Sequence, residues 1–201
     1  MAVSEERLVE LVAALTQGQD EAREATVQDL ADLGAAAVPP LVDLLQDSDQ
    51  DARWWAARTL AACGPAVDAT AREALMVALE DPTPEVRACA ALALGELRAT
   101  AAVDALAQRL GDEDALVASV AGAALACMGE AAIAVLVEVL LGGGAPRGRI
   151  LAVRALERIG APRSAGALWE ALAHDPNYLV HHHAYAALEA MGELEPIILL
   201  T

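Results

Sequence analysis

Apolar residues in the stretch 83–98 recur with the spacing of one helix face. Counting Val86 as position 1, positions 1, 5, 9 and 12 are Val86, Ala90, Leu94 and Leu97. At 100° per residue these side chains share one stripe. Thr83 suits an N-cap, and Pro84 suits the first helical position because the N–H that it lacks has no intrahelical partner there. The stretch therefore predicts a helix that buries one face.

The same stripe recurs in five other places along the chain. Position 5 is small and position 12 apolar in every copy. Position 9 is always leucine: Leu30, Leu60, Leu94, Leu125, Leu156 and Leu188. Position 13 is glycine in five copies, Gly34, Gly64, Gly129, Gly160 and Gly192. Glycine there predicts a left-handed residue that ends the helix. The third copy has Arg98 instead, and there we expect a different helix exit.

Successive copies of position 13 are 30, 34, 31, 31 and 32 residues apart, a period typical of stacked supersecondary units. A second apolar helix precedes each copy, with leucines at Leu11/Leu15, Leu41/Leu45, Leu75/Leu79, Leu106/Leu110, Leu136/Leu140 and Leu168/Leu172. The pattern predicts an all-α, right-handed α-solenoid of about six helical hairpins. We expect units at 4–34, 36–64, 71–98, 101–129, 130–160 and 163–192, a terminal helix at 193–201, and one domain over 1–201.

The string VRACAALALGEL at 86–97, with Asp81-Pro82 before it, resembles the HEAT-like repeat named after phycobilisome (bilin) lyases. The resemblance recurs six times and covers residues 5–192. It implies the HEAT-like solenoid fold, but this repeat serves many unrelated functions, so function has to be argued from surface residues.

Composition narrows the function classes. The net charge is −17, which disfavours sequence-independent binding to a phosphate backbone, and we expect no nucleic-acid partner. All 13 basic residues are arginine, which excludes a lysine Schiff base and a phosphate-loop lysine. The N-terminus lacks a secretory pattern, and Cys63, Cys89 and Cys127 lie in different repeats without metal-ligand spacing. These features indicate a cytoplasmic protein with reduced thiols.

Residues 115–141 contain only two charges, Glu130 and Glu138, and are long enough to suggest a membrane span. The break between repeats falls at Gly129, however, and both flanking helices keep the repeat pattern. We therefore expect two buried helices and no membrane partner.

Second helices line the concave side of HEAT-type stacks, and positions 3, 7 and 10 point away from the core stripe. We expect this face to bind a partner through Trp54, Arg58, Ala88, Leu92, Ser119, Ile150, Arg154, His182 and Tyr185. An exposed apolar strip with a polar rim is typical of an interaction site, and Trp, Tyr and Arg are common anchors. Trp54 is expected to face outward and Trp55 to be packed. The alternative is that superhelical curvature packs all these positions against neighbouring units.

Position 2 is arginine in four copies, Arg23, Arg53, Arg87 and Arg149. Acidic residues such as Asp47, Asp81 and Asp112 occupy the turns beside these positions. This column predicts a stacking ladder of exposed ion pairs that contribute about 0–1 kcal/mol each. A position-9 leucine contributes roughly 2–5 kcal/mol, so the leucines are expected to hold the fold.

Two polar clusters are candidates for ligand binding. Arg147, Arg149, Arg154, Arg158 and Arg163 form a basic patch that could receive a phosphate or an acidic partner; the alternative is a flexible turn with ordinary surface arginines. His181, His182 and His183 are consecutive, so their side chains diverge by 100° and cannot chelate one ion together without a loop partner. We expect no metal and no cofactor. The His-Glu pairs of HEAT-repeat deoxyhypusine hydroxylases are also missing from the sequence.

These observations predict a non-enzymatic scaffold that binds a protein or peptide on the concave face. The bilin lyase resemblance implies an alternative, a lyase-like subunit or chaperone that handles a tetrapyrrole. Arg154 and Arg158 would then meet the propionates, with His182 nearby.

Overall fold

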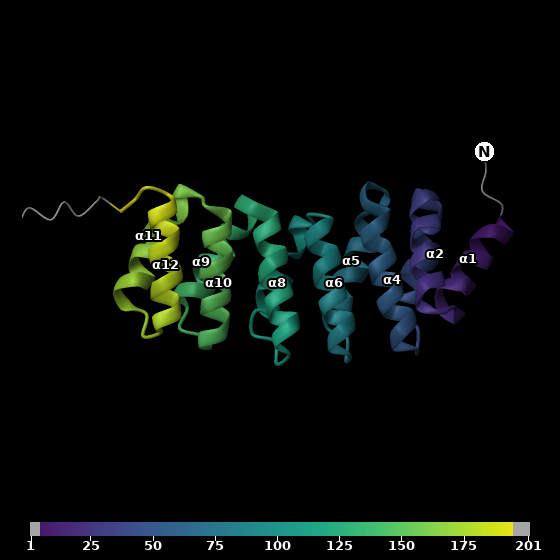
Figure 1. The fold of residues 1–201 in the computed structure, drawn as a ribbon, viewed down its shortest axis with the longest axis horizontal. Helices are drawn as coiled ribbons and strands as arrows, with labels where there is room; N and C mark the ends of the chain where they lie inside the picture. The colour runs from purple at the N-terminus through teal and green to yellow at the C-terminus, as the bar shows by residue number, and fades with distance from the viewer. Residues whose placement is uncertain (1–4, 195–201) are drawn as a thin grey trace, which may run out of the picture. The chain divides into compact units, whose positions relative to one another are not determined.

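The computed structural model describes residues 5–194, the side chain of residue 20 excepted, and this part of the chain contains helices and no strand (Figure 1). Twelve α-helices pair into six hairpins in the described residues. The hairpins are α1 (Glu5–Gln17) with α2 (Asp20–Asp32), α3 (Val38–Leu44) with α4 (Gln50–Cys63), α5 (Ala69–Ala78) with α6 (Pro84–Glu96), α7 (Val103–Arg109) with α8 (Ala115–Met128), α9 (Ile133–Leu141) with α10 (Pro146–Ile159), and α11 (Ala165–His174) with α12 (Tyr178–Ala190). The repeat predicted from the sequence is therefore confirmed.

The chain forms two compact units, residues 1–105 and 106–201, and the boundary falls within α7. In the first unit the second helices α2, α4 and α6 lie side by side, and each contacts the first helix of its own hairpin (Figure 1). In the second unit α8 contacts α10, and α10 contacts α12. Whether the 201 residues act as one domain stays a prediction.

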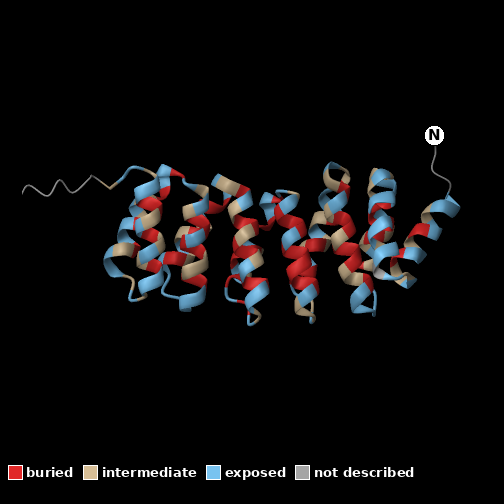
Figure 2. Ribbon diagram, viewed as in Figure 1, coloured by how far each residue is buried: buried red, intermediate tan, exposed pale blue. Residues whose placement is uncertain are grey.

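The position-9 leucines form the core of each unit. All six are 0% exposed, and Figure 2 shows buried residues within the second helices. Small residues let the helices approach closely. A Cβ added at Gly122 of α8 would lie 3.5 Å from Leu110 and 3.6 Å from Leu151 of α10. Position 6, which Gly122 occupies, therefore faces the following hairpin, and position 4, which Leu151 occupies, faces the preceding one.

Short polar side chains start the second helices. Asp49, Asp114 and Asn177 each accept a hydrogen bond from a backbone N–H in the first turn of the helix that follows. Thr83 occupies the equivalent position, but its side chain makes no capping hydrogen bond, contrary to our expectation. The Asp81 carboxylate instead accepts from the Thr83 backbone N–H at 2.8 Å. The turn between the two helices of a hairpin is therefore fixed by a carboxylate two residues before the cap.

Arg98 corrects the prediction of a different helix exit. Its φ is +46°, in the same left-handed region as the glycines at position 13 of the other repeats. The N–H of Ala99 donates to the carbonyl of Leu94 at 3.0 Å, and the N–H of Glu193 donates to Leu188 at 2.9 Å after Gly192. Both exits have the six-residue closure of a Schellman motif. Arg98 is the one described non-glycine residue with a positive φ.

Replacing Arg98 with glycine is expected to stabilise the protein by about 0.5–1 kcal/mol, because a side chain in the left-handed region costs about 1–2 kcal/mol and glycine recovers part of this. Urea unfolding followed by circular dichroism measures the change. Arg98→Ala is the control, because it removes the charge but keeps the Cβ. A glycine variant no more stable than the alanine variant would contradict the proposed strain.

One helical run of the described residues, Ala115–Leu141, is long and apolar enough to cross a membrane by length and composition. The run contains two helices, α8 and α9, joined by a 3₁₀ turn that starts at Gly129 with φ +61° and ψ −130°. Leu125 and Leu136 are fully buried on either side of the turn, as the repeat pattern predicts. The predicted terminal helix lies, from residue 195 onward, outside the described residues.

Candidate binding surface on the second helices

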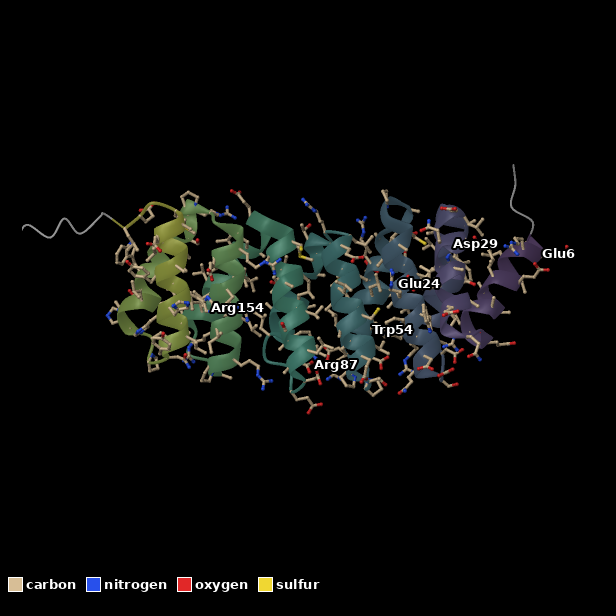
Figure 3. The ribbon with its side chains drawn as sticks, in the orientation of Figure 1. Glu6, Glu24, Asp29, Trp54, Arg87 and Arg154 are labelled. Carbon is tan, nitrogen blue, oxygen red and sulfur yellow. The ribbon has the colours of Figure 1, made fainter. Side chains whose placement is uncertain are left out.

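In the first unit, the predicted surface centres on the two adjacent tryptophans of α4. Trp54 is half-buried, and its ring meets the edge of Trp55 with the centroids 4.9 Å apart and an interplanar angle of 88°. Trp55 is 7% exposed, and the Arg23 guanidinium lies 5.8 Å from its ring centroid. Trp55 therefore packs between hairpins as expected, while part of the Trp54 ring remains available to a partner (Figure 3).

Neighbours of Trp54 on α2 and α6 complete this surface. Arg58, one turn after Trp54, donates to Glu24 of α2 at 2.8 Å. Leu92 of α6 is 47% exposed. Ala88 is 7% exposed, so the expectation that it contacts a partner is corrected. Ala88 is one turn closer to the start of α6, where the helix is buried on most sides. The first unit thus presents Trp54, Leu92 and a charged Arg58–Glu24 pair.

In the second unit, the equivalent surface is more polar. Ile150 of α10 is half-buried, while Ser119, Arg154 and His182 are exposed on α8, α10 and α12. Figure 3 shows Arg154 on α10. The His182 ring stacks near the Tyr178 ring, with centroids 6.3 Å apart. An exposed cation beside a partly buried isoleucine is the main feature of this face.

Tyr185 of α12 was also predicted to contact the partner. It occupies position 6, and the residues at position 6 of the preceding five repeats are all buried: Val27, Ala57, Ala91, Gly122 and Val153. Tyr185 is 50% exposed. Tyr185 is therefore available to a partner, but position 6 is buried in the earlier repeats, so its inclusion in the concave surface stays a prediction.

The arginine column forms ion pairs between successive hairpins, as predicted, but these pairs are buried. Arg53 donates to Asp81 through Nε at 2.6 Å and Nη2 at 2.9 Å, and the side chains are 12% and 7% exposed. Arg149 donates to Asp175 at 2.7 and 3.3 Å, and these side chains are 9% and 6% exposed. We call these two bidentate pairs the Arg–Asp ladder. The stabilisation of about 0–1 kcal/mol that is expected of an exposed ion pair therefore does not apply to these two buried pairs.

The surroundings of the two ladder carboxylates, Asp81 and Asp175, lower their pKa values. Burial raises the pKa of Asp81, but hydrogen bonds from Arg53 and from the Thr83 N–H outweigh burial and hold this pKa below its ordinary value. Asp175 has the same arrangement, with burial opposed by Arg149 and by the Asn177 N–H, and its pKa is also lowered. Both carboxylates are therefore charged in the folded protein at neutral pH.

One repeat lacks both the arginine and the aspartate that would form a further pair of the Arg–Asp ladder. The turn between α9 and α10 is Gly142-Gly143-Gly144-Ala145 and has no aspartate. Position 2 of the preceding repeat, which would supply the arginine, is Ala118. Elsewhere in the column, Arg87 donates to its own turn at the carbonyls of Asp81 and Pro82. The column is thus a structural device, with each arginine adapted to the turn beside it.

The five arginines of the predicted basic patch differ in their contacts, and whether the patch binds an anion stays a prediction. Arg147 donates to the carbonyls of Asp112 and Glu113 at 3.2 and 3.3 Å, and Arg149 is committed to Asp175. Arg163 contacts the Glu130 carbonyl and lies 3.6 Å from its carboxylate. Three of the five arginines therefore join neighbouring segments, and Arg154 and Arg158 remain exposed on α10.

The histidines of α12 each have a different environment. His183 contacts Glu157 of α10 at 2.7 Å, His181 contacts the Asp175 carbonyl, and His182 lies beside Tyr178. His174 lies 3.3 Å from Glu170 on α11. No group of three or more His, Cys, Asp or Glu side chains comes together within residues 5–194 in a way that could hold a metal ion.

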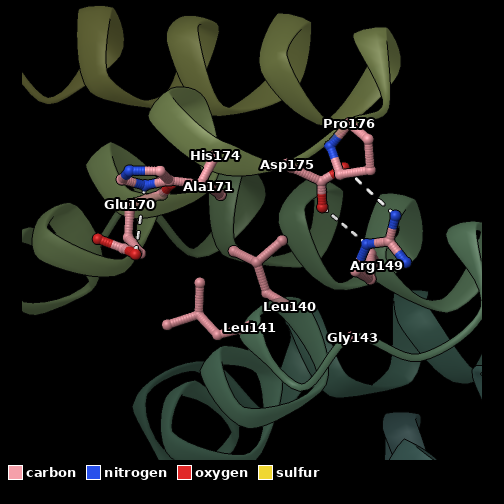
Figure 4. A pocket seen from close by; sticks show the side chains of 9 residues that line it. All are labelled: Leu140, Leu141, Gly143, Arg149, Glu170, Ala171, His174, Asp175 and Pro176. Atoms are coloured by element: carbon pink, nitrogen blue, oxygen red, sulfur yellow. Dashed lines mark hydrogen bonds and ion pairs between the residues drawn. The ribbon is translucent and has the colours of Figure 1, made fainter.

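A pocket that the sequence analysis missed lies in the second unit, between α9 and α11 (Figure 4). Its volume is about 480 Å³, and it is lined by Leu140, Leu141, Gly143, Arg149, Glu170, Ala171, His174, Asp175 and Pro176. The Arg149–Asp175 pair closes one end, and the Glu170–His174 contact lies at the rim. The three consecutive glycines at 142–144 could have predicted this pocket, because a turn without side chains leaves space beside it.

The three cysteines are free thiols. Burial raises the pKa of Cys63 to about 11 and that of Cys89 to about 12, so both are protonated at neutral pH. Cys127 is exposed.

The chain belongs to the HEAT repeat family, which matches residues 8–71, 65–126 and 133–201. No curated protein matches the sequence. Among solved structures, an engineered protein is 26% identical with a TM-score of 0.58, covering 93% of this chain and 97% of that one. A designed armadillo repeat protein is 24% identical with a TM-score of 0.54, covering 92% and 99%. The predicted all-α solenoid class is thereby confirmed.

The complex of CpcE and CpcF of phycocyanin lyase from Nostoc is also similar, with 24% identity and a TM-score of 0.46, covering 90% of this chain and 98% of that chain. This likeness is too distant to bear on function. The tetrapyrrole alternative stays a prediction.

Proposed function

We propose that this protein is a non-enzymatic scaffold that binds a protein or peptide segment on the exposed face of its second helices. One observation carries the proposal: position 7 of α6 exposes Leu92 by 47%. It lies on the same face as the half-buried Trp54 and the Arg58–Glu24 pair. Apolar side chains that are exposed beside an arginine and an aromatic ring are typical of interface anchors.

The distribution of polar groups supports binding rather than chemistry. Buried polar side chains of the described residues serve the fold: Arg53 and Arg149 join successive hairpins, and Thr59 donates to the Trp55 carbonyl at 2.7 Å within α4. A catalytic site needs titratable groups that converge on one pocket and are available to a substrate. The pocket between α9 and α11 has four such groups, but they are paired with one another, Arg149 with Asp175 and Glu170 with His174. We further propose a cytoplasmic location, which suits three free thiols.

The test is peptide selection against the purified protein, followed by titration of a selected peptide. Leu92→Glu, alone and with Trp54→Glu, is expected to weaken binding by at least about 30-fold, because each side chain is proposed as an anchor. Circular dichroism should show unchanged helix content. Val77→Glu is the matched control, since Val77 is 62% exposed on the first helix α5. Equal binding by wild type and both variants would contradict the proposed surface.

A further inference from the structure

The pocket between α9 and α11 has room for a small ligand (Figure 4). Its volume of about 480 Å³ lies within the roughly 300–1,000 Å³ that is typical of small-molecule sites. Leu140, Leu141 and Ala171 form its apolar wall, and Leu141 is 45% exposed. A Cβ added at Gly143 would meet no atom within 4 Å beyond its chain neighbours, so the pocket is open beside this turn. An apolar ligand body can therefore lie against Leu141.

The backbone around the pocket favours a positive charge. Leu141 and His174 are the last residues of α9 and α11, and both line the pocket. The last carbonyl groups of a helix have no partner within that helix, and its C-terminal end carries about −0.5 elementary charge. Because two such helix ends meet the same cavity, their partial charges act together on a ligand there.

The charged side chains of the pocket lie at opposite ends (Figure 4). At one end Asp175 neutralises Arg149, with 2.7 Å between the Asp175 carboxylate and the Nε of Arg149. At the other end Glu170 is 59% exposed and meets His174 through one oxygen, Oε1, at 3.3 Å. A carboxylate that already has one partner can accept further hydrogen bonds. Glu170 is thus the acceptor that a cationic ligand can reach.

We propose that this pocket binds an organic cation, with its ammonium or guanidinium group at Glu170 and its alkyl chain against Leu141. Residues 106–201 contain 11 acidic residues against 6 arginines, so the charge of the whole unit also favours a cation over an anion. A lysine or arginine side chain of a partner has this chemistry, and so does a free alkylamine.

This inference goes beyond the proposed function and does not depend on it. The pocket lies between first helices of the second unit, whereas Trp54 and Leu92 lie on second helices of the first unit. A failure of either proposal therefore leaves the other intact.

Titration of the full chain with hexan-1-amine, followed by ¹H–¹⁵N NMR spectra at about pH 8, tests the proposal, because a primary alkylamine is protonated there. The backbone resonances of Gly143, Glu170 and His174 are expected to shift and to reach saturation. Hexan-1-ol has the same chain without the charge and is expected to bind at least about tenfold more weakly, because a charge-assisted hydrogen bond is lost. Hexanoate is expected to leave these resonances unshifted.

Two variants test the assigned contacts. Glu170→Gln is expected to weaken the binding of hexan-1-amine at least about tenfold, and Leu141→Ala at least about threefold. Glu189→Gln is the matched control, since Glu189 is an exposed acidic residue of α12 that does not line the pocket. This control should bind as the wild type does, and circular dichroism should show unchanged helix content in all three variants.

Two further ligands distinguish the sources of the cation. A short peptide with one lysine between two leucines that binds more tightly than spermidine would support a partner's side chain, and the reverse order would support a free amine. Three results would overturn the proposal: no shift of the pocket resonances with hexan-1-amine, the same shifts with hexanoate, or wild-type binding by Glu170→Gln.

Discussion

Replacing Leu94 with alanine is expected to lower the free energy of unfolding by about 2–5 kcal/mol. Leu94 occupies position 9 of α6 and is 0% exposed. Its truncation removes buried apolar surface and leaves a cavity between helices that cannot collapse without moving their backbones. Urea unfolding followed by circular dichroism gives the change directly.

Leu92→Ala is the matched control for this prediction, because it makes the same chemical change two residues earlier in the same helix. Leu92 is 47% exposed, so we expect a loss of no more than about 1 kcal/mol. Equal losses at the two positions would contradict the assignment of Leu94 to the core and Leu92 to the surface. A Leu92→Ala variant that folds normally but binds selected peptides less tightly would support the assignment of Leu92 both to the protein surface and to the proposed binding surface.

Replacing Asp81 with asparagine is expected to cost about 3 kcal/mol at pH 7, since it leaves Arg53 largely buried without its charged partner. The pKa of Asp81 is lower in the folded protein than in the unfolded chain, where it is about 3.9. The stabilisation is therefore complete well above the unfolded value and is lost as the pH falls through the folded value. The difference between wild type and variant should shrink as the pH falls from 7 to 3.

Asp29→Asn is the control for the ladder. Its pair with Arg7 is 3.0 Å long but about half exposed, so we expect a cost of only about 0–1 kcal/mol at pH 7. Asp175→Asn should behave as Asp81→Asn does, because its pair with Arg149 is equally buried and its pKa is also lowered. A pH-independent cost at Asp81 and Asp175 would show that the two carboxylates act through shape rather than charge.

The repeat and its core could be predicted because both depend on residue spacing. A period of about 31 residues with leucine at position 9 leaves few ways to bury the leucines other than stacked hairpins. Glycine at position 13 indicated the left-handed exits for the same local reason. Arg98 was misjudged because a side chain tolerates the left-handed region when the surrounding helices enforce it, and nothing local in the sequence reveals that enforcement.

The sequence by itself determined which residues are apolar and on which helix face they lie, and hence the hairpins and the paired Arg and Asp positions. Only the tertiary structure decided how much of each face remains exposed. Ala88 and Leu92 both lie on the outward face of α6, yet the first is 7% and the second 47% exposed. Tyr185 is 50% exposed, although position 6 is buried in each of the five earlier repeats. Exposure depends on which neighbours are present, and a residue's own position in a helix does not contain that information.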